Sequence, residues 1–261
     1  MTIPDIQSKP DLRKITIDKV GVKGIQYPIK VEDRANGSQP TVADLNLYVE
    51  LPHNMRGTHM SRFLEVLNRY HEDKLIESLE PFLRELKDKL KADAAYADIC
   101  FPYFVKKSAP VSKISSLLNY PCEFNASFRD EFKLWIGVKV PVTTLCPCSK
   151  EISEWGAHNQ RSEITIKVRY TGFVWLEELI SLAEEASSCP IYPLLKRVDE
   201  KYVTEKAYNN PKFVEDIVRE LTQKLGSDER ILEFHVESDN YESIHNHNAY
   251  AMISRSLDQP H

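Results

Sequence analysis

Residues 132–170 read FKLWIGVKVPVTTLCPCSKEISEWGAHNQRSEITIKVRY, two alternating segments joined by a connection that contains cysteine and histidine. On both sides of the connection apolar residues occupy every second position, which predicts strands with one buried face. The connection holds Cys146, Cys148 and His158. Thiolate and imidazole bind Zn²⁺ and similar ions. The segment therefore predicts candidate metal ligands at the end of a sheet.

The residues before this segment predict a strand pair, two helices and a further strand. Period-two alternation changes to helical spacing and then returns. The first strand is one long strand or two strands separated near Gly21. The expected elements are strands at 15–31 and 42–51, helices at 60–70 and 75–90, and a strand at 99–105.

The second half of the chain repeats this order, which predicts an α+β fold of two similar units, each with antiparallel strands and a helix pair. We place the first unit at residues 13–115 and the second at residues 116–261, behind a loose N-terminal arm at residues 1–12. The elements expected in the second unit are a hairpin at 124–142, a strand at 164–170, helices at 174–186 and 211–226, and strands at 232–236 and 245–253.

The helix expected at 211–226 has clear end signals. Asn210 suits its N-cap, Pro211 its first position and Gly226 its exit. On this helix Glu215 points about 120° away from the apolar stripe. Periodicity alone therefore makes Glu215 a solvated glutamate, and Glu200 is likewise one acid among many.

The composition is that of an ordinary globular protein. The 261 residues carry 34 Lys and Arg against 39 Asp and Glu, a formal charge of -5, which argues against a general nucleic-acid surface. No stretch approaches the ~20 apolar residues of a membrane span, and the N-terminal residues lack the apolar core of a signal peptide. Five cysteines, an odd number, agree with a reducing compartment. We expect a cytoplasmic protein that binds neither nucleic acid nor membrane.

Two histidine and cysteine patterns are candidates for chemistry. Cys146, Cys148 and His158 suit a divalent ion, although two packed cysteines and a surface histidine remain an equal alternative. His245 and His247 would share one face of a strand and suit proton transfer or metal binding, with Glu242 close by. A polar loop entering the last strand is the alternative.

Basic residues gather beside the same segments, which favours an anionic substrate. Most surface lysines have no such role, so only some of these are expected to bind it. The candidates for substrate binding are Arg62, Lys107, Lys150, Arg161 and Lys206.

At these residues the chain strongly resembles the GTP cyclohydrolases of type IB. The resemblance covers nearly the whole length and implies the tunnelling fold, in tandem units that form a homotetramer. It is carried by GTHMSRF at 57–63, FPYFVKKSAPVS at 101–112, LCPCSKEISEWGAHNQRS at 145–162, LLKRVDEKYVTEKAYNNPKFVED at 194–216 and ESIHNHNAYA at 242–251.

The resemblance implies that GTP and water are converted to 7,8-dihydroneopterin triphosphate and formate, the first step of folate and pterin biosynthesis. It implies one divalent metal per site, Mn²⁺, Fe²⁺ or Zn²⁺, held by Cys146, His158 and Glu200. Glu215 would anchor the guanine edge. As catalytic residues it implies Cys146, His245 and His247, together with Cys148 and Glu242, whose roles are less clear.

Two other functions are compatible with the residues. A related tunnelling-fold nitrile reductase would use a nucleophilic cysteine and NADPH, whereas the pairing of Cys146 with His158 favours metal-dependent hydrolysis. A noncatalytic metal-binding assembly protein would bind the ion without turning over GTP.

Overall fold

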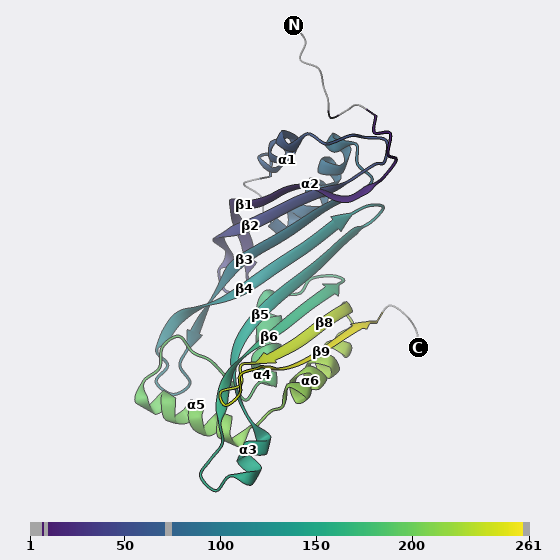
Figure 1. Cartoon of the computed structure of the whole chain (residues 1–261). Coiled ribbons are helices and arrows are strands. Elements are labelled where there is room, and N and C mark those ends of the chain that lie inside the picture. The colour runs from purple at the N-terminus through teal and green to yellow at the C-terminus, as the bar shows by residue number, and fades with distance from the viewer. Residues whose placement is uncertain (1–6, 8–9, 71–74, 258–261) are drawn as a thin grey trace. The chain divides into compact units, whose positions relative to one another are not determined.

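Strands dominate the fold, as the alternation predicts. The computed structural model describes residue 7, residues 10–70 and residues 75–257 (Figure 1). The chain divides into two compact units: unit 1 is Met1–Phe101 with Glu123–Trp135, and unit 2 is Pro102–Cys122 with Ile136–His261. Three long strands contribute residues to both units: β3 (Ala95–Ser108), β4 (Ser115–Phe128) and β5 (Phe132–Leu145).

Unit 1 is built on a long hairpin of β1 (Ile17–Asp33) and β2 (Gly37–Leu51), with β2 paired to β3. The first strand is continuous, which settles the alternative left open near Gly21. A Cβ atom at Gly21 would lie 1.9 Å from the carbonyl oxygen of Leu47, so only glycine allows the two strands to approach this closely.

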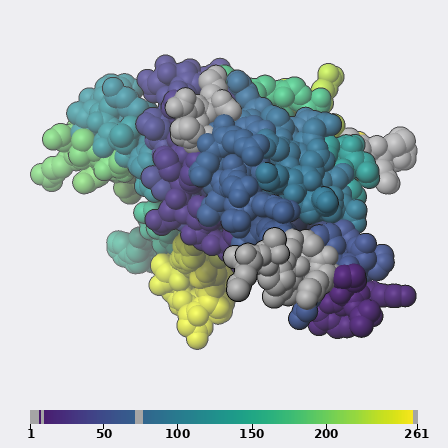
Figure 2. Space-filling model, turned by 90° about the horizontal axis from the view of Figure 1, so that it is seen from above, coloured from purple at the N-terminus to yellow at the C-terminus, as the bar shows by residue number. Residues whose placement is uncertain are grey.

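Helices α1 (Met60–Leu67) and α2 (Leu75–Leu90) pack on this hairpin and form much of the surface of unit 1, shown in shades of blue in Figure 2. On both helices the buried residues recur at helical spacing, so each helix turns one apolar stripe toward the hairpin. The hairpin contributes every second residue of its strands to the same core. The buried residues include Phe63 and Val66 of α1, Leu79, Leu83 and Leu86 of α2, and Leu45, Leu47, Val49 and Leu51 of β2.

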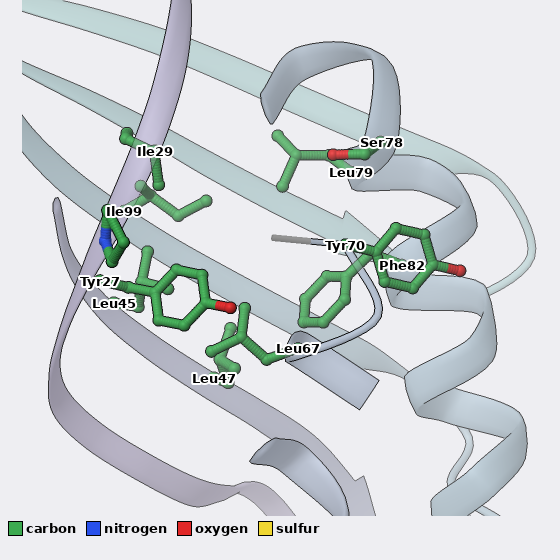
Figure 3. A pocket seen from close by; sticks show the side chains of 11 residues that line it. Tyr27, Ile29, Leu45, Leu47, Leu67, Tyr70, Ser78, Leu79, Phe82 and Ile99 are labelled. Atoms are coloured by element: carbon green, nitrogen blue, oxygen red, sulfur yellow. The ribbon is translucent and has the colours of Figure 1, made fainter. Parts of the chain in front are cut away.

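A cavity of about 30 Å³ lies between the hairpin and the helices of unit 1 (Figure 3). Its lining is mostly apolar and includes Leu47, Leu79 and the rings of Tyr27 and Phe82. The ring of Tyr70 packs edge-on against Phe82, with centroids 5.6 Å apart. The cavity is an imperfection of the core, about as large as a water molecule or two.

The strands that contribute to unit 2 are neighbours in the order β3-β4-β5-β6-β8-β9. Helix α4 packs against β6, and helix α6 packs against β8 and β9 (Figure 1). The two-residue strand β7 (Cys189–Pro190) pairs with β5. The remaining elements are α3 (Pro147–Ile152), β6 (Asn159–Tyr170), α4 (Leu176–Ala186), α5 (Arg197–Asn209), α6 (Val214–Gly226), β8 (Ile231–Asn240) and β9 (Ala249–Ser256).

The start of the last helix differs from the sequence prediction. Asn210 is the C-cap of α5, and its side-chain amide donates to the carbonyl oxygens of Ser187 and Ser188. Helix α6 begins later, where Asp216 accepts from the backbone N–H of Phe213 at 3.0 Å. Asn210 and Pro211 thus resemble a helix start but belong to the turn between two helices.

Helix α5 was not predicted as a helix, because it lacks an apolar stripe. Only Asp199 and Ala207 are buried on it, and polar residues occupy most of the other positions. The Asp199 carboxylate accepts from the backbone N–H groups of Val111, Ser112 and Lys196 and from the Ser112 hydroxyl, at 2.6–2.9 Å. These bonds, rather than an apolar face, attach α5 to the rest of unit 2.

The element order repeats along the chain: β1-β2-α1-α2-β3-β4 is followed by β5-β6-α4-α6-β8-β9, with α3, β7 and α5 inserted. This order favours a repeat boundary in the turn between β4 and β5. The division at residue 115 stays a prediction, since compactness alone does not test where a repeat begins. Among the described residues, no helix combines the length and the apolar character needed to cross a membrane.

Candidate active site

The two ends of the connection between β5 and β6 lie next to each other. The backbone N–H of Cys146 donates to the carbonyl oxygen of His158 at 3.2 Å, and the N–H of His158 donates to the Ser149 hydroxyl at 3.2 Å. Gly156 has a φ of 126°, a left-handed conformation that favours glycine in the returning turn. The two candidate ligands, far apart in the connection, therefore start from adjacent backbone positions.

The two cysteines of this connection have different environments. Cys146 is the N-cap of α3, and its sulfur accepts from the N–H of Ser149 at 3.5 Å. Pro147 occupies the first helical turn, so the chain leaves strand geometry immediately after Cys146. Cys148 is consequently exposed on the helix and does not line the cavity that Cys146 faces.

A cavity of about 320 Å³ in unit 2 collects most of the predicted catalytic residues. This volume is within the range of small-molecule sites. Its lining comes from both ends of the β5–β6 connection, from the start of α6 and from the β8–β9 loop. The lining residues are Cys146, Pro147, His158, Gln160, Lys212, Phe213, Val214, Glu215, Asn240, Glu242, His245, His247 and Ala249.

The His158 side chain is held on one side by hydrogen bonds. Its Nδ1 atom lies 3.0 Å from Oε1 of Gln160 and 3.3 Å from the Ser243 hydroxyl. Gln160 in turn donates from Nε2 to Oε1 of Glu242 at 3.3 Å. The segment after β8 is thereby tied to the start of β6.

His245 and His247 lie together, but not on a strand. The last strand begins at Ala249 instead of at His245, so the strand predicted from 245 to 253 is too long at its start. Both histidines occupy the β8–β9 loop, where their rings stack with centroids 5.0 Å apart and an interplanar angle of 14°. Both rings line the cavity, although they reach it from a loop and not from one face of a strand.

Glu215 stands in the first turn of α6 and lines the same cavity. The Glu215 side chain is exposed, as the helical repeat predicts, and its exposed side faces the cavity. Nearby, Lys212 donates to Glu220 at 2.7 Å. Burial opposes ionisation of Glu220, but the hydrogen bonds and charges of Lys212 and Lys224 hold its pKa below the ordinary value.

None of the five predicted substrate-binding cations lines this cavity. Lys107 forms a largely buried ion pair with Glu184, and the same carboxylate accepts from Tyr120 at 2.7 Å. Burial lowers the pKa of Lys107, although Glu184 opposes this shift. Lys206 on α5 lies near enough to Lys107 to repel its charge.

The other three cations are placed differently. Lys150 donates to the carbonyl oxygen of Tyr208 at 2.6 Å and lies over its ring. Arg161 is exposed and follows Gln160 on β6, so its side chain lies on the opposite face of the strand. Arg62 belongs to unit 1, where it donates to the carbonyl oxygen of Lys89 at 3.4 Å.

Glu200 lies outside the cavity of unit 2. It is exposed in the first turn of α5, whereas the chain returns to the cavity after the last turn, where Lys212 N–H bonds to the carbonyl oxygen of Leu145. The intervening helix spans roughly 13 Å at 1.5 Å per residue. The third predicted metal ligand is thus displaced from Cys146 and His158.

Sequence reasoning missed Gln160 and Asn240 at the cavity. Both are buried and continue the inward-facing phase of a strand beyond its apolar part: Gln160 and Ser162 precede Ile164 on β6, and Asn240 follows Val236 in phase on β8. A polar residue in the buried phase of a strand was the available signal, since such groups need partners. Lys212 carried no comparable signal.

Comparison with known proteins identifies the family of the chain. The model of a family described as type I GTP cyclohydrolase folE2 matches residues 3–251. The chain belongs to this family. Proteins named GTP cyclohydrolase FolE2 from Geobacter metallireducens and Nitrosococcus oceani are 57% and 54% identical to this folE2-family chain. Both alignments cover 97% of it, with 97% and 95% of the relatives. Membership confirms the resemblance and decides against both alternative functions.

Solved structures share the fold of this folE2-family chain at very low identity. Uricase from Arthrobacter globiformis matches with a TM-score of 0.54 at 6% identity, covering 93% of this chain and 94% of the uricase. Urate oxidase from Bacillus sp. TB-90 matches with a TM-score of 0.51 at 8% identity, covering 92% and 100%. The predicted α+β tunnelling fold, with antiparallel sheet and helices, is confirmed.

The donor types in the cavity fit a divalent metal. Cys146 offers a sulfur and His158 an imidazole whose Nδ1 is already hydrogen-bonded, an arrangement typical of metal-binding histidines. Within residues 10–70 and 75–257, no three His, Cys, Asp or Glu side chains are grouped closely enough to hold one ion. Two donors are fewer than the three protein ligands of a typical catalytic zinc site.

Proposed function

We propose that the cavity of unit 2 is the active site in which this GTP cyclohydrolase opens the guanine ring of GTP. The reaction releases formate and yields 7,8-dihydroneopterin triphosphate, the first step of folate biosynthesis. One observation supports this location most strongly: Cys146, His158, Glu215, His245 and His247 meet at one cavity of about 320 Å³. Neither the mostly apolar cavity of unit 1 nor the hollow beside Glu80, Arg84 and Asp88 of α2 combines thiol, imidazole and carboxylate groups.

Cys146 and His158 would hold one divalent ion. A bound Mn²⁺, Fe²⁺ or Zn²⁺ supplies the Lewis acid that activates water for attack at C8 of guanine. Thiolate favours Zn²⁺ and Fe²⁺, while a carboxylate ligand tolerates Mn²⁺. The Cys146–His158 backbone bond keeps the two donors in fixed register.

Glu215 would bind the guanine edge, because a carboxylate at the cavity wall can accept from N1–H and the N2 amino group together. The stacked rings of His245 and His247 would move protons to and from the opening ring, because an imidazole can act as a general acid or base. Cys148 is exposed outside the cavity, so its catalytic role stays a prediction that the geometry does not favour.

Lys212 is the cation that lines the cavity, and we add it to the candidates for the triphosphate. Its ion pair with Glu220 is more exposed than the pair of Lys107 with Glu184, so exchanging its partner for phosphate costs less. Lys150, Arg161, Lys206 and Arg62 stay predictions for that role. For Lys107 the buried ion pair with Glu184 favours a structural role instead, because binding phosphate would require breaking it.

Glu200 would complete the metal site of a second copy of the chain. It is exposed on α5 about 13 Å along the helix from the end that returns to the cavity. Another face of the same helix exposes the apolar residues Val198 and Tyr202, and exposed apolar residues on a helix suit a subunit interface. The expected homotetramer would provide such contacts.

The cytoplasmic location of the protein also stays a prediction.

The activity test is GTP turnover with formate and pterin detection, after reconstitution with Mn²⁺, Fe²⁺ or Zn²⁺ in turn. At least one ion is expected to support formation of both products. Absence of both products with every ion would refute the proposal.

Mixing variants tests the shared site. Subunits carrying Cys146→Ala and subunits carrying Glu200→Ala are each expected to be inactive alone and to regain activity in hybrid oligomers. The matched control combines Cys146→Ala with His158→Ala, which lie in one cavity and cannot complement. Failure of both mixtures would place Glu200 in its own subunit's site, and full activity of Glu200→Ala alone would place it outside the site.

A further inference from the structure

We propose that Gln160 is a positioning residue that sets the tautomer of His158, and that Glu242 sets the orientation of Gln160. The inference deepens the proposed function and rests on its assignment of His158 as a metal ligand. It gives Glu242 a defined task at the cavity and adds a residue that no pattern of acids or histidines would select.

Gln160 lies between the two groups it connects. It stands at the start of β6 and is only 7% exposed, so its amide depends on protein partners. Its Oε1 lies 3.0 Å from His158 Nδ1, and its Nε2 lies 3.3 Å from Glu242 Oε1. The three side chains form one chain of hydrogen bonds along the cavity wall.

The orientation of the Gln160 amide follows from Glu242. An ionised carboxylate only accepts hydrogen bonds, whereas a glutamine amide has one donating and one accepting end. The amino end of Gln160 must therefore face Glu242, and the carbonyl end must face His158. Rotating the amide by half a turn would place two acceptors against each other at 3.3 Å.

The tautomer of His158 follows from Gln160. A carbonyl oxygen only accepts, so Nδ1 of His158 must carry the proton. The Ser243 hydroxyl, 3.3 Å from the same nitrogen, can accept from that N–H as well. A neutral imidazole has one N–H, so Nε2 keeps the lone pair that metal binding requires. The metal-free protein is thus already in the tautomer that binds a metal.

Nitrogen-15 NMR of the metal-free protein with labelled histidine, at a pH where His158 is neutral, measures this directly. Wild-type His158 is expected to be protonated on Nδ1. Gln160→Leu removes the acceptor, and Glu242→Gln allows the Gln160 amide to turn; both are expected to give a mixture with the Nε2–H form. Gln223→Leu, an exposed glutamine of α6, is the matched control and should match the wild type.

An Nε2–H tautomer in the wild type overturns the inference, and so does an unchanged Nδ1–H signal in both variants. The second result would assign the tautomer to Ser243. If Gln160→Leu fails to fold, Glu242→Gln still decides, because it keeps the size of the side chain.

Metal affinity separates this inference from the proposed function. Titration with Co²⁺ and competition with Zn²⁺ are expected to show about 10–100-fold weaker binding in Gln160→Leu, the usual loss when a residue that orients a ligand is removed. If Gln160→Leu keeps the metal affinity of the wild type while His158→Ala loses it, the role proposed for Gln160 is wrong and the assignment of His158 as a ligand stands. Wild-type affinity in His158→Ala would refute the ligand assignment, while the NMR measurement still judges Gln160.

Discussion

The cavity in the core of unit 1 differs in size and chemistry from the cavity of unit 2. The first has a volume of about 30 Å³ and a mostly apolar lining, whereas the second has about 320 Å³ and a lining that includes sulfur, imidazole and carboxylate groups. The difference arises in the inward phase of the strands, that is, in the alternate residues that point into the interior. On β2 this phase stays apolar through Leu51, whereas on β6 it becomes polar at Ser162 and Gln160. A short polar run in the buried phase converts a core into a site.

The largest expected effect is the loss of the metal from unit 2. His158→Ala and Cys146→Ala each remove a donor, so metal affinity should fall by more than the about 10–100-fold typical of a residue that only orients a ligand. Turnover should fall with it. Calorimetric titration of the metal-free protein measures the change. Full metal content in both variants would show that the polar cavity is not the metal site.

The second effect belongs to unit 1 and should leave the metal unaffected. Leu79 is 2% exposed and lines the cavity of unit 1, so Leu79→Ala removes buried apolar contacts and enlarges that cavity. The free energy of unfolding should fall by about 3 kcal/mol, within the usual range for such a truncation. Urea denaturation measures the loss. Leu64→Ala, at an exposed position of the neighbouring helix α1, is the control and should change stability little.

Much of unit 1 could be predicted from the sequence, because its strands and helices obey simple periods. The hairpin, α1 and α2 bury residues at period-two or helical spacing, and the structure has each of them. Helix α5 obeys no such period, because polar groups attach it, among them the buried carboxylate of Asp199. Local pattern cannot report a bond to a turn that lies far away in the sequence.

The candidate site of unit 2 was less accessible to pattern than its fold. Cys146 and His158 stand out as residue types, but Glu215 was identified only through a family resemblance, because an exposed helical glutamate is ordinary. The stacking of His245 on His247 depends on a loop that has no period at all. Sites built from the ends of elements depend on how those ends meet, and this is a tertiary property.

A third, smaller effect separates substrate binding from metal binding within unit 2. Glu215→Gln keeps the size of the side chain but replaces one acceptor by a donor that faces the guanine N–H groups. Loss of a charged hydrogen bond of about 1.5–3 kcal/mol predicts a roughly 10–100-fold lower kcat/KM for GTP. Metal affinity should be unchanged. A fall in metal affinity equal to that of His158→Ala would make Glu215 a ligand instead of a substrate anchor.

The smallest effect tests whether the polar character of unit 2 makes its stability depend on pH. Glu220 has a pKa below its ordinary 4.5, because Lys212 and Lys224 outweigh the effect of its burial. A lowered carboxyl pKa stabilises the folded state above the unfolded pKa, and this contribution is lost as the pH falls through the folded value. Glu220→Gln should therefore cost about 1 kcal/mol at neutral pH, as for a partly buried pair, and nothing at strongly acidic pH. Urea denaturation across the acid range, with Glu229→Gln as an exposed control, measures this. A pH-independent cost would mean that Glu220 acts through packing and that its ion pair with Lys212 at the cavity contributes no stability.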